Sequence, residues 1–110
     1  MKVILDENLP KPLKGILPNH TVTTVQEQAL TGTLNGTLLL RLEGDFDIFI
    51  TADKNLRYQQ NLRGRSLAIL ELPTNRLPLL RPMFPRIAAA VDAISAGEYV
   101  QLTFSSPNGA

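Results

Sequence analysis

Two stretches decide the fold of this chain: Lys2-Val-Ile-Leu-Asp6-Glu7-Asn8-Leu-Pro10, and Phe46-Asp-Ile-Phe-Ile-Thr51-Ala-Asp53-Lys-Asn55. Each contains a short, mostly apolar run that ends in acidic and amide side chains. Such runs predict strands that are buried on both faces, as in a parallel sheet. The polar residues then mark the place where each strand leaves the sheet.

Around these strands, at residues 2–5 and 46–51, strand and helix patterns alternate. Further strands are predicted at residues 21–25, 66–72 and 99–104, and helices at residues 11–17, 37–43 and 77–95. Asn35 or Thr33 could cap the second helix. Pro82 and Pro85 predict a kink in the last helix, and residues 55–61 are compatible with a further short one. The alternation predicts an α/β three-layer sandwich: a mostly parallel sheet of about four strands, helices on both faces and a C-terminal edge strand.

Length and composition fit one small globular domain. The chain has 110 residues, of which 44% are hydrophobic and 19% charged. We assign residues 1–104 to the domain and residues 105–110 to a flexible tail. The core of so small a domain is small, so dimerisation would be a natural way to bury more apolar surface. The absence of cysteine excludes disulfides, thiolate metal sites and cysteine nucleophiles.

The start of the sequence indicates where the protein works. The five residues before Asp6 are too few for the apolar core of a signal peptide, and no stretch approaches the ~18 apolar residues of a membrane span. The lack of cysteine fits a reducing compartment. We therefore expect a cytoplasmic protein with no membrane partner.

The predicted sheet sorts the polar residues by edge. In an open α/β sheet, ligands bind beyond the carboxyl ends of the strands. Residues that follow a strand or begin a crossover helix belong to this edge: Asp6, Glu7, Asn8, Gln26, Glu27, Asn35, Asp53, Lys54, Asn55, Arg57, Thr74 and Arg76. The opposite edge receives His20, Glu43, Asp45, Asp47, Arg63 and Arg65. We therefore expect no catalytic role for His20.

Asp6 and Asp53 are the candidate catalytic pair. The first and third strands should be neighbours, so the two carboxylates should lie close together and repel each other. A hard divalent cation, Mg²⁺ or Mn²⁺, would relieve that repulsion because it prefers oxygen ligands, and it can convert a bound water into a nucleophile. Either residue alone could instead be a turn former or a helix cap.

Further candidates at this edge fall into three groups: metal ligands (Glu7, Asn35 and Asn55), supporting residues (Thr51 and Asn8) and phosphate-binding residues (Lys54, Arg57 and Arg76). The asparagines could equally be turn or cap residues. Residues 54–86 hold seven basic residues and one acid, Glu71, whereas the rest of the chain holds four basic and nine acidic residues. This asymmetry suits a polyanion held over an acidic centre, although a solvated basic face has the same composition.

The two stretches also resemble a known family. Asp6-Glu7-Asn8-Leu9-Pro10 and Thr51-Ala-Asp53-Lys54-Asn55-Leu56 are similar to the two signatures of small bacterial PIN-like proteins, which are related to VapC toxins and other PIN ribonucleases. The resemblance covers nearly the whole chain. It implies a PIN-like fold and a Mg²⁺- or Mn²⁺-dependent endoribonuclease in which Asp6 and Asp53 are catalytic. It also implies a homodimer and, for a toxin, a small antitoxin protein as partner.

Two positions depart from the family pattern. The Ser-Asp that typically begins the helix after the second strand is Leu34-Asn35 here, and the second acid of the third-strand motif is Asn55. An amide brings no charge, so this centre should bind a cation more weakly than a full set of carboxylates. The expected substrate is single-stranded RNA with little sequence readout, because the aromatic content is 5% and no RNA-reading motif is present.

Two other classes of protein fit parts of the pattern. A degenerate PIN-like module, which dimerises or binds a partner without catalysis, is favoured by Asn35 and Asn55. A response-regulator receiver domain would use Asp6 and Glu7 as its acidic pair and Asp53 as the phosphoacceptor. Thr74 would supply the hydroxyl after the fourth strand. A receiver also needs a lysine after its last strand, and this chain has no lysine beyond Lys54.

Overall fold

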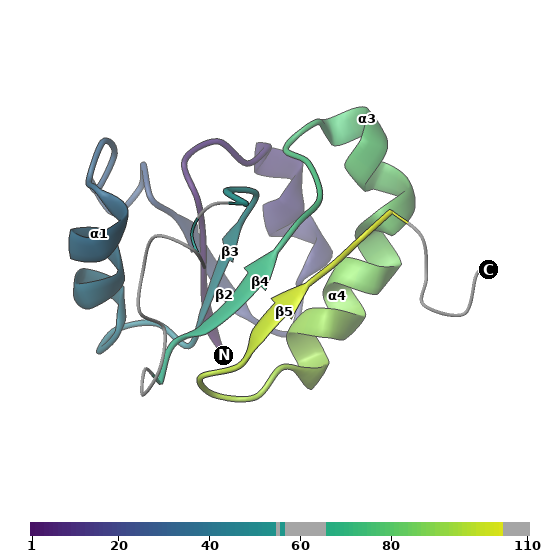
Figure 1. The fold of residues 1–110 in the computed structure, drawn as a ribbon. Helices are drawn as coiled ribbons and strands as arrows, with labels where there is room; N and C mark the ends of the chain where they lie inside the picture. Colours follow the sequence, from purple (N-terminus) through teal and green to yellow (C-terminus); the bar gives the residue numbers. More distant parts are fainter. Residues whose placement is uncertain (55, 57–65, 105–110) are drawn as a thin grey trace.

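A computed structural model of the chain describes residues 1–54, 56 and 66–104 (Figure 1), except for the side chain of Asn35. The elements in chain order are β1 (Lys2–Leu5), the 3-10 helix η1 (Lys11–Ile16), β2 (Thr21–Thr24), α1 (Asn35–Leu42), β3 (Ile48–Thr51), β4 (Ala68–Glu71), α3 (Leu77–Leu80), the 3-10 helix η2 (Arg81–Met83), α4 (Phe84–Ala93) and β5 (Tyr99–Gln101). The predicted helical segment at residues 55–61 and the predicted tail at residues 105–110 lie outside the described residues, apart from Leu56.

The strands form one five-stranded sheet in the order β2-β1-β3-β4-β5, and every neighbouring pair is parallel. The α/β alternation predicted from the sequence is therefore confirmed. The C-terminal strand was expected as an addition to about four strands; it is a full parallel member of the sheet beside β4. The order is that of flavodoxin-like doubly wound folds, in which the chain switches sides of the sheet between β1 and β3.

Helices cover both faces of the sheet, which makes three layers (Figure 1). On one face η1, α3, η2 and α4 pack on strand residues such as Val3, Ile50 and Leu70. On the other face α1 packs on Ile4 and Phe49. Successive strand residues alternate between the two faces, and all of these side chains are buried because the strands are covered on both sides.

Helix α1 differs from its prediction at its start. Its buried stripe of Leu38, Leu39 and Leu42 faces the sheet, as the leucine spacing predicts. The cap prediction was wrong: Leu34 occupies the N-cap position without a side-chain cap bond, and Asn35 is the first helical residue.

The long helix predicted at residues 77–95 is divided by its prolines. Pro82 lies in the first turn of η2 and Pro85 in the first turn of α4, where a missing N–H is tolerated. The kink was therefore correctly predicted. The helix predicted at residues 11–17 is the 3-10 helix η1, which ends at Ile16 and has Pro12 near its start. No helix in residues 1–54, 56 and 66–104 is long and apolar enough to cross a membrane.

The buried core should dominate stability. Phe49 is fully buried in the central strand β3, whereas Leu40 on α1 is 69% exposed. We expect Phe49→Ala to lower the free energy of unfolding by about 3–5 kcal/mol, because it removes a large buried side chain and leaves a cavity. Leu40→Ala should change it by less than about 0.5 kcal/mol. Urea unfolding followed by circular dichroism would measure both, and similar losses in the two variants would contradict this core.

Candidate functional site

The crevice between β1 and β3 lies where the chain switches sides of the sheet. From β1 the chain continues to β2 on one side, and it later enters β3 on the other. In folds with this strand order, ligands bind at the carboxyl end of that crevice. Asp6 directly follows β1, and Asp53 comes two residues after β3. The topology thus brings the two predicted carboxylates to the position where doubly wound folds bind ligands.

A hollow of about 310 Å³ opens at this point. It is lined by Asp6, Glu7, Asn8, Leu9, Ala52 and Asp53. Both aspartates and Glu7 are half-buried, and Asn8 is exposed. We call it the acidic hollow, because three of its six lining residues carry carboxylates.

The Thr51 hydroxyl connects the two strands of the site. It donates a hydrogen bond of 2.6 Å to Oδ2 of Asp6, and it accepts one of 3.0 Å from the backbone N–H of Asp53. Oδ1 of Asp6 accepts a further bond of 2.8 Å from the backbone N–H of Glu7. Thr51 is fully buried at the end of β3. The orientation of the Asp6 carboxylate is therefore fixed from both sides.

Burial raises the pKa of the Asp6 carboxyl above its ordinary value. The bonds from Thr51 and from the Glu7 backbone act in the opposite direction, because they stabilise the charged form. The nearby carboxylates of Glu7 and Asp53 raise the pKa further by repulsion. A cation bound among these carboxylates would offset both the burial of the Asp6 charge and its repulsion by Glu7 and Asp53. The electrostatics of the hollow therefore fit a divalent metal ion.

Glu7 ties the site to the loop after β2. Its Oε2 accepts a hydrogen bond of 3.3 Å from the backbone N–H of Gly32, and its carbonyl oxygen accepts one from Nε2 of Gln26. Gly32 has a φ of 80°, which favours glycine. Glu7 thus contributes charge to the acidic hollow while its carboxylate is engaged at the rim.

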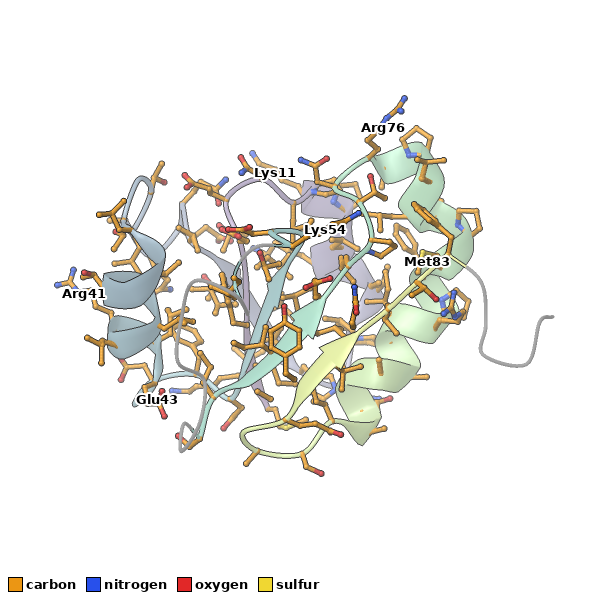
Figure 2. All side chains as sticks on the ribbon, in the orientation of Figure 1. Lys11, Arg41, Glu43, Lys54, Arg76 and Met83 are labelled. Atoms are coloured by element: carbon orange, nitrogen blue, oxygen red, sulfur yellow. The ribbon has the colours of Figure 1, made fainter. Side chains whose placement is uncertain are left out.

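The predicted phosphate-binding residues are not all brought together. Lys54 follows Asp53 directly, and Figure 2 shows it above the carboxyl edge of the sheet. Arg76 is exposed before α3, does not line the acidic hollow, and points outward from the molecule in Figure 2. Arg57 lies outside the described residues.

Two of the candidate metal ligands are amides, Asn35 and Asn55. Asn55 and the side chain of Asn35 lie outside the described residues. Within residues 1–54, 56 and 66–104, no three histidine or acidic side chains are grouped so that they could hold a metal ion by themselves. The described centre therefore offers a pair of carboxylates, Asp6 and Asp53. Mg²⁺ is commonly held by one or two carboxylates together with waters and substrate phosphates.

Two residues assigned to the opposite edge, His20 and Asp47, lie there, whereas Arg63 and Arg65 lie outside the described residues. His20 precedes β2, and its Nε2 is 2.6 Å from Oδ1 of Asp92 on α4. Asp47 precedes β3 and accepts a hydrogen bond of 2.8 Å from the backbone N–H of Lys2. Both contacts connect elements at the amino ends of the strands, so neither residue belongs to the acidic hollow.

Sequence patterns placed Glu71 in its strand but did not single it out as a buried acid near the site. This residue ends β4, lies opposite Thr51 in the strand register and is fully buried. Its Oε1 accepts a hydrogen bond of 2.5 Å from the Tyr99 hydroxyl, whereas its Oε2 has no hydrogen-bond partner among the described residues. A single acid in an otherwise apolar strand was the available signal, because a carboxylate is rarely buried without partners.

Comparison with protein-family models, with curated proteins and with solved structures found no match.

The raised pKa of Asp6 has a testable consequence. In the unfolded chain Asp6 loses its proton at its ordinary pKa, whereas the folded chain holds the proton to higher pH, so stability is lost as pH rises through this interval. Asp6→Asn removes that penalty. The amide has one acceptor oxygen where the carboxylate has two, so the variant also loses one of the bonds from Thr51 and Glu7 at every pH. We therefore expect the stability of the variant relative to that of the wild type to increase as pH rises from 3 to 7. Urea unfolding across this pH range measures the difference, and a difference that is independent of pH would contradict the assignment.

Proposed function

We propose that this chain is a PIN-like domain that hydrolyses phosphodiester bonds of single-stranded RNA with Mg²⁺ or Mn²⁺. The observation that carries the proposal is the pairing of Asp6 and Asp53 in one hollow at the switch point of the sheet. The resemblance of both motifs to PIN-like proteins supplies the reaction class. A homodimer and, if the protein is a toxin, a small antitoxin partner belong to the same proposal.

In this proposal the Asp6 and Asp53 carboxylates hold the metal ion. When bound, a divalent ion supplies a water of lowered pKa and stabilises negative charge on the phosphate. Thr51 keeps the Asp6 carboxylate oriented towards the centre through its 2.6 Å hydrogen bond. Lys54, next to Asp53, provides a positive charge for the phosphate of the substrate.

One observation favours a second candidate, a degenerate module that binds a partner without catalysis. In the described part of the chain the two aspartates are not joined by a third histidine or acidic side chain that completes a metal site. Two carboxylates give a weaker site than three or four, since each ligand charge adds to the attraction for the cation.

The receiver alternative has support from topology alone. The strand order β2-β1-β3-β4-β5 is shared with receiver domains. However, β5 and the described residues after it (Leu102 to Phe104) contain no lysine to contact a phosphoryl group. We therefore keep hydrolysis as the proposed reaction.

An RNA cleavage assay tests the proposal. The wild type is incubated with single-stranded RNA of mixed sequence in Mn²⁺, Mg²⁺ or EDTA, beside Asp53→Asn and the matched control Asp45→Asn at the opposite edge. We expect metal-dependent cleavage that falls by at least about 100-fold in Asp53→Asn and is unchanged in Asp45→Asn. Cleavage that persists in EDTA or in Asp53→Asn would count against this centre.

Metal binding can be tested without activity. A ligand that binds only the folded chain stabilises it by RT ln(1 + [L]/Kd), which is about 1.4 kcal/mol at ten times Kd. Thermal unfolding should therefore shift upward by several degrees when Mn²⁺ is added to the wild type, and by much less in Asp53→Asn. A shift in the wild type without any RNA cleavage would favour the degenerate module over the nuclease.

A further inference from the structure

A second hollow, of about 400 Å³, lies beside the acidic hollow. It is lined by Leu9, Lys11, Lys14, Thr24, Gln26 and Glu27. Leu9 lines both hollows, and Gln26 of the second donates a hydrogen bond to the carbonyl oxygen of Glu7 in the first. We call it the lysine hollow. A single strand of RNA that leaves the acidic hollow over Leu9 would enter the lysine hollow directly.

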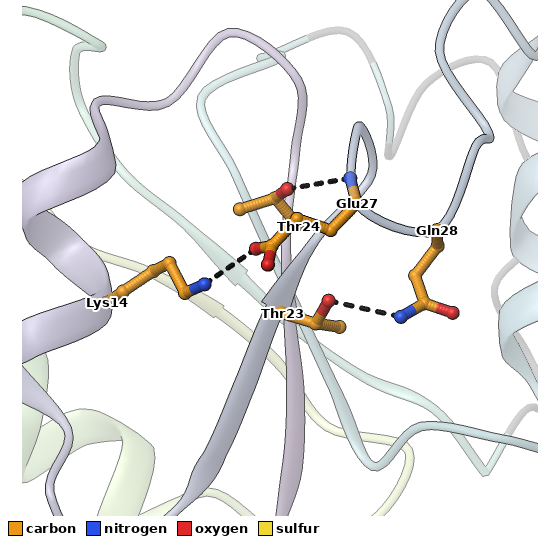
Figure 3. Close-up of polar contacts among 5 residues, drawn as sticks. All are labelled: Lys14, Thr23, Thr24, Glu27 and Gln28. Atoms are coloured by element: carbon orange, nitrogen blue, oxygen red, sulfur yellow. Dashed lines mark hydrogen bonds and ion pairs between the residues drawn. The ribbon is translucent and has the colours of Figure 1, made fainter.

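An ion pair within the chain occupies part of the lysine hollow (Figure 3). The Lys14 ammonium lies 2.6 Å from Oε1 of Glu27, and the backbone N–H of Glu27 donates a 3.0 Å bond to Oγ1 of Thr24. The Lys14 ammonium lowers the pKa of the Glu27 carboxyl, so this carboxyl is charged at neutral pH. The two side chains are 37% and 49% exposed. Exposed pairs of this kind contribute little to stability, so another anion can replace Glu27 at small cost.

Lys11 is the second cation of this hollow. It is exposed at the start of η1 and has no ion-pair partner among the described residues. Figure 2 shows it on the same rim of the molecule as Lys54. An acidic hollow suited to a metal ion is therefore flanked by two lysines on its β2 side. A chain of phosphates fits this arrangement, since one phosphate can contact the metal while its neighbour contacts the lysines.

We propose that Lys11 and Lys14 bind the RNA phosphate next to the scissile one, and that Glu27 occupies Lys14 until RNA displaces it. This inference rests on the proposed function for the position of the scissile phosphate. The RNA strand then crosses Leu9 from the acidic hollow into the lysine hollow. Contacts between lysines and phosphates position the RNA backbone and carry no sequence information, in agreement with the absence of RNA-reading motifs from the sequence.

The sequence contained a signal for this subsite. The first crossover begins at the carboxyl edge, so residues in its first turn, including Lys11, belong to the same edge as Asp6. The pairing of Lys14 with Glu27 needed the structure, because the two residues belong to different elements, η1 and the loop after β2.

RNA binding in EDTA separates the subsite from catalysis. Binding of a fluorescent single-stranded RNA is measured by anisotropy at several salt concentrations for the wild type, Lys11→Ala, Lys14→Ala and the control Lys2→Ala. Lys2 is an exposed lysine at the opposite edge of the sheet. Loss of one phosphate contact should weaken binding about fivefold at 0.1 M salt and reduce the salt slope by about 0.7. Lys2→Ala should behave as the wild type, and the same behaviour in both lysine variants would overturn the proposal.

Glu27 supplies the sharper test. If Glu27 competes with RNA for Lys14, Glu27→Gln should bind RNA about two- to fivefold more tightly than the wild type. Lys14→Ala leaves Glu27 unpaired and repulsive, so the double variant Lys14→Ala/Glu27→Gln is needed. It should bind more weakly than Glu27→Gln alone if Lys14 contacts phosphate. Equal affinity of these two variants, or no gain in Glu27→Gln, would overturn the exchange.

Kinetics distinguish this inference from the proposed function. In metal, Lys11→Ala and Lys14→Ala should raise KM about fivefold with little change in kcat, because they remove contacts made equally in the ground and transition states. Cleavage with an unchanged KM in both variants would leave the nuclease standing and overturn the subsite. Lysine-dependent binding without cleavage in any metal would support the lysine contacts and overturn the nuclease.

Discussion

The parallel pairing of β1 with β3 is the constraint on which the rest of the site depends. The register joins Leu5 to Ile50, and the backbone N–H of Asp6 continues the ladder with a 2.9 Å bond to the Ile50 carbonyl oxygen. Because this bond fixes the backbone at the end of β1, the Asp6 carboxylate comes within 2.6 Å of the Thr51 hydroxyl. A slip of one residue would turn Asp6 to the other face of the sheet and away from Thr51.

The same register produces a change from apolar to polar side chains along one face of the sheet. Ile4, Phe49 and Ile69 form an apolar row under α1, and two residues further on Asp6, Thr51 and Glu71 form a polar one. The apolar row stabilises the fold, whereas the polar row takes the half-buried Asp6 and the buried Glu71 carboxylates partly out of water, which costs stability. The raised pKa of Asp6 expresses that cost.

Much of the fold and part of the candidate site could be predicted from the sequence. The apolar runs identified the parallel strands, the prolines identified the breaks in the last helix, and the edge rule placed Asp6 and Asp53 together. The sequence did not predict the features that tertiary contacts determine. The start of α1 at Asn35 and the ion pair of Lys14 with Glu27 depend on neighbours distant in sequence or on the exact path of the loop. Glu71 was assigned to its strand, but its burial and its bond to Tyr99 depend on the position of β5.

The sequence by itself determined the alternation of elements and which residues lie at the carboxyl edge, because hydrophobic periodicity and chain direction are local properties. The tertiary structure decided which of those edge residues face one another. It joined Thr51 to Asp6, turned the Glu7 carboxylate to Gly32 and set the lysine hollow beside the acidic one. These contacts depend on strand order and register, which are set by the packing of the whole sheet between its two helical layers.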